Sequence, residues 1–175
     1  MITVWGTADL HFFDEDIIRY ENRPFKSVEE MNETLIKNWN DRVDPEDIVF
    51  VLGDVSAGDR EETSEIIHRL KGHKILIMGN HDRDKSPDYW LSVGFDEVSR
   101  YPIICNGYFI LSHEPPSYFQ ETTPYAFFYG HVHSTSMYQT VTEKTACVCV
   151  ERWNYAPAIL DKVTEQMCFM KLKAR

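Results

Sequence analysis

Five short polar motifs in this chain each follow a run of apolar, strand-like residues. They are Asp9-Leu10-His11, Gly53-Asp54, Gly79-Asn80-His81-Asp82, His113 and Gly130-His131-Val132-His133. Their side chains offer carboxylate and amide oxygens and imidazole nitrogens, a mixture that suits Mn²⁺, Fe²⁺, Zn²⁺ or Ni²⁺. Seven of these residues can act as metal ligands and one histidine is left over, which is the set that a two-metal site for phosphoester hydrolysis requires.

The spacing within the motifs supports shared ions. Asp9 and His11 are two residues apart at a strand end, so both side chains can reach one ion, and His131 and His133 repeat that spacing. Asp54 has two carboxylate oxygens and can bridge two ions. No cysteine is placed to join them, which excludes a site of the zinc-finger type.

Each motif must be positioned by the apolar segment before it. The segments are 2–8, 48–52, 74–78, 108–112 and 125–129. Functional residues in layered α/β proteins gather at the carboxyl ends of strands. If these strands lie side by side, the ligands therefore converge in one crevice.

Helices are predicted between the early strands. Residues 27–41 have a capping box of Ser27 and Glu30 and an apolar face. Residues 60–71 follow a cap at Asp59 and end before a glycine, and Ser86-Pro87 begins a short helix.

The second half of the chain is predicted to be mostly strands. They cover 95–101, 102–105, 108–112, 125–129, 137–141 and 146–151, with Asn106-Gly107 as a hairpin turn. A helix at 161–166 and a last strand at 167–172 complete the prediction. The order of elements fits an α/β fold with two packed sheets and helices outside.

Composition limits the class of protein. A length of 175 residues predicts one domain over 1–175 that folds without disulfides. No apolar run reaches the ~18 residues of a membrane span and no signal peptide is recognised, so a cytoplasmic protein without a membrane partner is expected. The net charge of −10 argues against long nucleic acid as a partner. The sequence leaves the oligomeric state open.

Together, the five motifs resemble those of the calcineurin-like metallophosphoesterase superfamily. The resemblance covers residues 9–133, about three quarters of the chain. It implies a four-layer αββα sandwich with two mixed sheets flanked by helices. It also implies two divalent ions, with Mn²⁺ as the first choice. One ion would be held by Asp9, His11, Asp54 and His133, and the other by Asp54, Asn80, His113 and His131.

The resemblance further implies a mechanism. Two ions roughly 3.5–4 Å apart share a hydroxide that attacks phosphorus in line with the leaving oxygen. His81 would face the substrate as the catalytic histidine, either protonating the leaving group or hydrogen-bonding a phosphate oxygen. The expected substrate is a small phosphoester, with a phosphodiester favoured and a nucleotide-like group compatible.

One position departs from the protein phosphatase branch. That branch has an aspartate three residues after the Gly-Asp aspartate, where this chain has Ala57. Asp59 and Asp82 are the remaining candidates to orient His81. The departure disfavours a protein phosphatase.

A narrower resemblance lies in residues 16–20 and 22–25, which look like a small bacterial and phage subgroup of the superfamily. Arg23 and Arg83 are candidates to bind phosphate oxygens, because guanidinium suits that geometry, with surface salt bridges as the competing interpretation. Tyr118 and Phe119 could stack on a ring of the substrate or pack within their own loop.

Two other functions compete with a phosphoesterase. A metal-stabilised scaffold that binds a protein would be expected to lose ligands or the free histidine, and this chain keeps both. A nuclease acting on nucleic-acid ends is opposed by the acidic charge and the lack of basic tracts.

Overall fold

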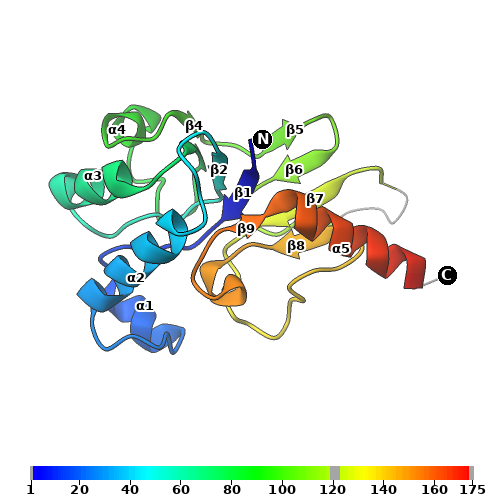
Figure 1. Ribbon diagram of the computed structural model, residues 1–175, viewed down its shortest axis with the longest axis horizontal. Coiled ribbons are helices and arrows are strands. Elements are labelled where there is room, and N and C mark those ends of the chain that lie inside the picture. The colour runs from blue at the N-terminus through cyan, green and yellow to red at the C-terminus, as the bar shows by residue number, and fades with distance from the viewer. Residues whose placement is uncertain (1, 119–122, 174–175) are drawn as a thin grey trace.

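The computed structural model describes residues 2–118 and 123–173, and within them two mixed β-sheets pack face to face (Figure 1). The first sheet has the order β4-β3-β2-β1-β9 and the second the order β5-β6-β7-β8. In the first, β1 to β4 are parallel and β9 is antiparallel; in the second, only β5 is antiparallel. The two mixed sheets with packed helices that the sequence predicted are confirmed.

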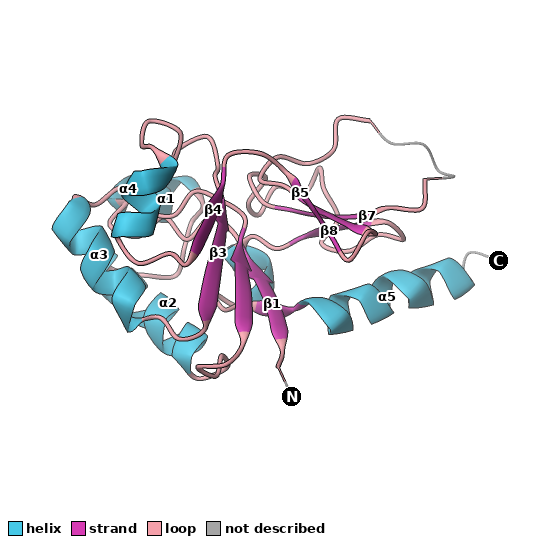
Figure 2. Cartoon of the chain, turned by 90° about the horizontal axis from the view of Figure 1, so that it is seen from above, coloured by secondary structure: helices cyan, strands magenta, loops and turns pink. Residues whose placement is uncertain are grey.

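The first sheet is built from strand–helix–strand units. Its strands are β1 (Val4–Thr7), β2 (Ile48–Val51), β3 (His73–Ile77), β4 (Glu97–Ser99) and β9 (Ala158–Ile159). The helices of these units are α1 (Glu15–Tyr20), α2 (Val28–Asn40), α3 (Arg60–Arg69) and α4 (Pro87–Ser92). Figure 2 shows these helices on one side of the sheet and the second sheet on the other.

Alternation along β2 explains the two cores. Val49 and Val51 pack against the helices, whereas Phe50 and Leu52 belong to the core between the sheets. Successive side chains on a strand point to opposite faces, so a strand covered on both faces is apolar throughout. The buried strand predicted at 48–52 is confirmed.

The predicted caps also form. The Ser27 hydroxyl accepts the amide of Glu30 at the start of α2, and Asp59 forms a reciprocal capping box with Glu62 at α3. Ser86 caps α4, with Pro87 at its first position. The short helix α1 was not predicted; Asp14 caps it by accepting the amides of Asp16 and Ile17.

The second sheet contains β5 (Ile103–Cys105), β6 (Phe109–Leu111), β7 (Ala126–Tyr129) and β8 (Thr145–Cys147). Asn106 and Gly107 both have positive φ, 53° and 66°, as the predicted β5–β6 hairpin turn requires. The strand predicted at 95–101 shortens to β4, which pairs with β3 in the first sheet and not with its neighbour in sequence.

The strand pair predicted at 137–141 and 146–151 is wrong for most of its length. Within the described residues, Val141 makes only an isolated bridge with Ala146, and Val150–Trp153 is a 3₁₀ helix. Arg152 contacts this segment, and its guanidinium donates to the carbonyl oxygens of Thr135 and Tyr138. Within the predicted strand, the carbonyl oxygen of Tyr138 is thus satisfied by a side chain.

The C-terminal strand predicted at 167–172 is also wrong, because α5 (Leu160–Lys173) continues through it. Leu160, Val163 and Met167 recur at helical spacing and join the core between the sheets. None of the helices in the described residues has the length and apolar character needed to cross a lipid bilayer.

Candidate metal centre

All five motifs lie at the carboxyl ends of strands, where the two sheets meet. The first sheet supplies Asp9 and His11 after β1, Asp54 after β2, and Asn80 and His81 after β3. The second supplies His113 after β6 and His131 and His133 after β7. These eight residues therefore come from loops that follow strands of both sheets, and close contacts connect their side chains.

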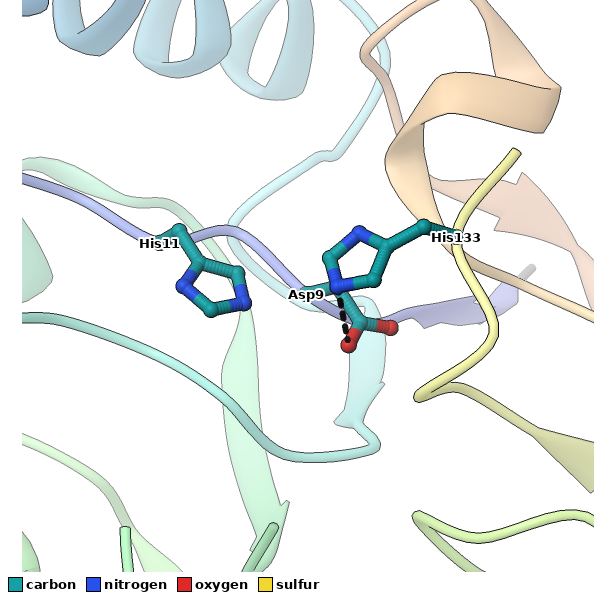
Figure 3. Close-up of side chains that lie close together, drawn as sticks. All are labelled: Asp9, His11 and His133. Carbon is teal, nitrogen blue, oxygen red and sulfur yellow. Dashed lines mark ion pairs between the residues drawn. The ribbon is translucent and has the colours of Figure 1, made fainter. Parts of the chain in front are cut away.

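Two groups of donor atoms form among these residues. The first contains Asp9, His11 and His133, whose ligand atoms lie within 4.8 Å of one another (Figure 3). His133 Nε2 is 3.6 Å from Asp9 Oδ1. The second group contains Asp54, His113 and His131 at the same spacing.

Asn80 joins the second group. Its Oδ1 is 2.8 Å from His113 Nε2 and 2.9 Å from His131 Nδ1, and those two nitrogens are 3.1 Å apart. Two donors that each lie ~2.1 Å from one ion at right angles are ~3 Å apart. The spacing of this group is thus compatible with three donors to one ion.

Asp54 connects the two groups. Its Oδ2 lies 3.4 Å from His113 Nε2 and 3.7 Å from His11 Nε2, one nitrogen from each group. Its other oxygen accepts the backbone amide of His81 at 3.0 Å. One carboxylate oxygen therefore faces both groups, as a bridging ligand would.

Three histidines present Nε2 to the site because an acceptor holds Nδ1. His11 Nδ1 donates to Asp14 Oδ2 at 3.0 Å, His113 Nδ1 to the carbonyl oxygen of Leu52 at 2.7 Å, and His133 Nδ1 to Glu151 Oε1 at 3.0 Å. Such partners fix the tautomer and orient the ring of a metal-binding histidine.

Two features of the first group, one on a histidine nitrogen and one on a carboxylate, indicate that a cation fits it. Among the described residues, His11 Nε2 is buried and has no hydrogen-bond partner. Burial raises the pKa of Asp9 despite the opposing charges of His133 and His113. A cation in the first group would supply the missing partner of His11 and stabilise the charged form of Asp9.

In the second group, Asp54 and His113 shift each other's pKa in opposite directions. Burial alone would raise the pKa of Asp54, but its hydrogen bond and ion pair with His113 outweigh burial and hold that pKa at about 2. Burial alone would lower the pKa of His113, but Asp54 and Asp9 raise it to about 9. A divalent ion bound here would displace the proton from His113.

The backbone at the ligands is strained. Five of the candidate ligands have φ between 45° and 70°, in the left-handed region that only glycine enters freely; they are Asp9, His11, Asp54, His131 and His133. Each such residue costs on the order of 1–3 kcal/mol. Strain concentrated on one set of polar side chains is a feature of functional sites.

Two glycines make room for the donors. A Cβ atom on Gly79 would lie 2.2 Å from Asp54 Oδ1, and one on Gly130 would lie 2.7 Å from Asp9 Oδ2. The close approach of neighbouring loops to the carboxylates therefore depends on the missing side chains.

The site is buried on one side and open on the other. Asp9, His11, Asp54 and His113 are buried, whereas Asn80, His81 and His131 are exposed. The His81 ring packs edge-on against His11, with ring centroids 5.4 Å apart. In the part of the chain that the structure describes, no carboxylate accepts a hydrogen bond from the His81 ring.

Neither candidate partner of His81 therefore orients its ring. Asp59 caps α3, and Asp82 is fully buried with its carboxylate on the backbone amides of Asp54, Val55 and Gly79. Ala57 lines a cavity of about 160 Å³ beside His81. The position that holds an aspartate in protein phosphatases is thus open space here.

The two candidate arginines lie in different environments. Arg83 is exposed, forms an ion pair with Glu114 at 3.2 Å and lines a cavity of about 270 Å³ next to His113. The side chain of Arg23 is fully buried and lines neither this cavity nor the one beside His81. Direct phosphate binding by Arg23, as predicted from the sequence, does not fit this position.

Further histidines, cysteines and aromatic residues lie outside the five motifs. His68 and His73 are exposed. Cys147 and Cys149 are buried with their sulfurs 3.1 Å apart. Tyr118 is 79% exposed, and Phe119 lies outside the described residues.

Sequence reasoning missed two carboxylates that hold the ligands. Asp14 had a local signal, because it follows His11 by three residues and precedes a helix. Glu151 had none, because it lies 18 residues from His133 along the chain.

The chain is similar in sequence to a known protein family and to individual relatives. A family model described as calcineurin-like phosphoesterase matches residues 2–154. An uncharacterized protein of Methanocaldococcus jannaschii is 37% identical over 172 residues, covering 94% of this chain and 91% of the relative. The gene 66 protein of Mycobacterium phage L5 is 39% identical over 88 residues, which are 47% of this chain and 41% of the phage protein.

A solved structure has the same fold. The crystal structure of a protein of unknown function from Aquifex aeolicus superposes with a TM-score of 0.71 at 25% identity, covering 95% of this chain and all of that one.

Proposed function

Because this chain belongs to the calcineurin-like phosphoesterase family, we propose that it is a two-metal enzyme that hydrolyses a small phosphodiester. The family establishes the general class of metal-dependent phosphoesterase. The observation that carries the more specific proposal is the position of Asp54 Oδ2, which lies within 3.7 Å of a histidine nitrogen in each donor group. In that position, Asp54 would be able to serve as a ligand for an ion in each group.

The proposed ligands follow the two groups. Asp9, His11, Asp54 and His133 would hold one ion, and Asp54, Asn80, His113 and His131 the other. Bound there, two divalent ions would supply a hydroxide nucleophile and offset the charge that develops on the phosphate oxygens. Mn²⁺ is our first choice, and the nitrogen and oxygen donors also suit Fe²⁺, Zn²⁺ and Ni²⁺.

His81 is proposed as the catalytic residue that this chain itself supplies. It is exposed at the open side of the site and is not required as a ligand. Its backbone amide donates to Asp54, which fixes the residue beside the donor groups. We assign to it the transfer of a proton to the departing oxygen.

The preference for a diester is supported by two cavities. One contains His11, Asp54 and His81, and the other reaches His113 and Arg83. A diester has an organic group on either side of its phosphorus, and each group would occupy one cavity. The second cavity also contains Pro102, Ile110 and Phe127, which suit an apolar or ring-shaped group such as that of a nucleotide.

Arg83 is proposed as a substrate-binding residue at the rim of the second cavity. Its ion pair with Glu114 joins two half-exposed side chains, and such pairs contribute little stability. An incoming anionic group can therefore displace Glu114 at small cost.

The first experiment is a paired assay of Mn²⁺-loaded protein on bis-p-nitrophenyl phosphate and p-nitrophenyl phosphate, with Asp54→Asn as the matched control. Turnover of the diester that disappears in the variant is the expected result. Faster turnover of the monoester would remove the diester preference. If the protein binds two ions but hydrolyses neither substrate, a protein-binding scaffold would be favoured. Salt-sensitive binding of single-stranded oligonucleotides would favour a nuclease.

A further inference from the structure

A buried ion pair connects two distant parts of the chain behind the first donor group. Arg23 Nη2 lies 2.6 Å and Arg23 Nε 3.0 Å from Glu151 Oε1, and the two residues are 128 positions apart. Their side chains are 0% and 4% exposed. Desolvating a buried ion pair costs free energy that can exceed its Coulombic gain, so stability alone does not explain why this pair is present.

Arg23 also binds the backbone of the first motif. Its Nη2 donates to the carbonyl oxygen of Asp9 at 2.7 Å, and its Nη1 to that of Leu10 at 2.9 Å. Both carbonyls belong to the segment where Asp9 and His11 have positive φ. The planar guanidinium thus holds a strained turn in place through several fixed donors.

Glu151 binds the last motif. The oxygen that accepts from Arg23, Oε1, also accepts from His133 Nδ1 at 3.0 Å, so the opposite nitrogen of that ring faces Asp9. The next residue, Arg152, donates from Nε to the carbonyl oxygen of His133 at 2.6 Å. The 3₁₀ helix Val150–Trp153 therefore forms hydrogen bonds with both the ring and the backbone of His133.

We propose that Arg23 and Glu151 are positioning residues that set the geometry of one metal ion by tying Asp9 to His133. This inference rests on the proposed function, because it takes those two residues as ligands of one ion. A carboxylate on Nδ1 also makes Nε2 a stronger ligand. In the second group, the Nδ1 of His113 is held by a backbone acceptor, the carbonyl oxygen of Leu52, and not by a carboxylate.

The test is a calorimetric titration of metal-free protein with Mn²⁺, comparing wild type with Glu151→Gln. The variant keeps the shape of the side chain but loses its charge. Loss of a group that supports a metal ligand typically weakens metal binding ~10–100-fold. We expect that loss at one of the two binding events, with the other unchanged. The electron paramagnetic resonance spectrum should change from that of a coupled Mn²⁺ pair to that of a single ion.

Arg23→Lys provides a second variant in case Glu151→Gln folds poorly. Lysine keeps the charge beside Glu151 but cannot also reach the carbonyl oxygens of Asp9 and Leu10. It should weaken the same binding event, by less than Glu151→Gln does.

Asp47→Asn is the matched control. Asp47 is also a buried carboxylate, and it accepts hydrogen bonds from the Thr3 and Asp44 amides and the Trp5 indole beside the amino-terminal ends of β1 and β2. The variant should lower stability without changing Mn²⁺ affinity. Equal weakening of Mn²⁺ binding in Asp47→Asn and Glu151→Gln would reduce Glu151 to a structural residue and overturn the proposal.

The remaining outcomes are also decisive. Unchanged titrations in both Glu151→Gln and Arg23→Lys would overturn the inference, as would a wild-type chain that binds no Mn²⁺. A wild type that binds two ions and loses one through Glu151→Gln, yet hydrolyses no phosphoester, would uphold the positioning role and refute the proposed enzyme.

Discussion

The carboxylate of Asp82 accepts a hydrogen bond from the backbone amide of Asp54, 28 residues earlier in the chain, at 2.8 Å. The same carboxylate accepts the amides of Val55 and Gly79 at 3.0 and 2.8 Å. Asp82 is fully buried. It joins the loops after β2 and β3 and so fixes the distance between Asp54 and Asn80.

Asp82→Asn should therefore destabilise the metal-free protein by ~2–3 kcal/mol, because an amide NH₂ group would face amide donors that lose their acceptor. Urea unfolding measures the change. Asp41→Asn is the control, since the exposed pair of Asp41 with Lys37 contributes only a few tenths of a kcal/mol. Equal unfolding midpoints in the two variants would contradict the structural role of Asp82.

The metal-free protein should lose stability as the pH rises from 6.5 toward 9. His113 has its pKa raised from 6.5 to about 9 in the folded state, so its contribution is complete below 6.5 and is lost as pH rises through 9. The raised pKa of His133 acts in the same direction. Asp54, with its pKa lowered from 3.8 to about 2, contributes above 3.8 and loses that contribution as pH falls through 2.

Thermal unfolding in chelator across this pH range tests the assignment. His113→Gln should flatten the decline between pH 6.5 and 9. A wild-type Tm that stays level or rises over that interval would show that the proton on His113 is not held as the geometry indicates.

Removing metal should lower the Tm. Ions bind the folded chain only, and a ligand present at 100 times its Kd stabilises a protein by ~2.7 kcal/mol. Without ions, the buried carboxylates of Asp9 and Asp54 repel each other, as the upward effect of Asp54 on the pKa of Asp9 indicates. Scanning calorimetry with and without chelator measures the difference, and Asp54→Asn should respond much less. An unchanged wild-type curve would argue against a tight preformed site.

His81→Ala should reduce kcat by ~10²–10⁴-fold while both ions remain bound, because general-acid catalysis is typically worth that much. The loss should be greater for a substrate with a basic leaving group than for a nitrophenyl ester, since nitrophenolate departs without a proton. Metal content and kcat for two diesters measure this, with His68→Ala on α3 as control. An equal loss on both diesters would assign His81 to binding a phosphate oxygen.

Gly79→Ala should impair the site more than the fold. The added Cβ would lie 2.2 Å from Asp54 Oδ1 and force the bridging carboxylate to move. Metal content after dialysis should fall, whereas Gly6→Ala, whose Cβ would lie 2.6 Å from the Leu160 side chain, should keep it. Full metal occupancy in Gly79→Ala would contradict the proposed bridging role of Asp54.

Local patterns were enough to predict the strands that carry the ligands. An apolar run followed by a polar motif can be recognised within a single short segment of sequence. The continuous apolar run at residues 48–52 indicates a strand that is covered on both faces. The helix caps at Ser27 and Asp59 were equally local, since each involves a partner three residues away.

Two of the predicted strands were wrong, for different reasons. Residues 137–141 have the composition of a strand, but Arg152 donates to the carbonyl oxygen of Tyr138 and to the hydroxyl of Thr140 within them. Residues 167–172 fit a strand by composition, yet the apolar face begun at Leu160 and Val163 extends α5 through them.

The sequence by itself therefore determined the candidate ligands, because their chemistry depends on residue type and on position after a strand. Tertiary structure alone decided how those ligands are held. The sequence predicted Arg23 as a phosphate-binding residue, but packing buries it against Glu151, 128 positions away. A contact between such distant residues depends on how the two sheets are stacked, and no local pattern of residues specifies that.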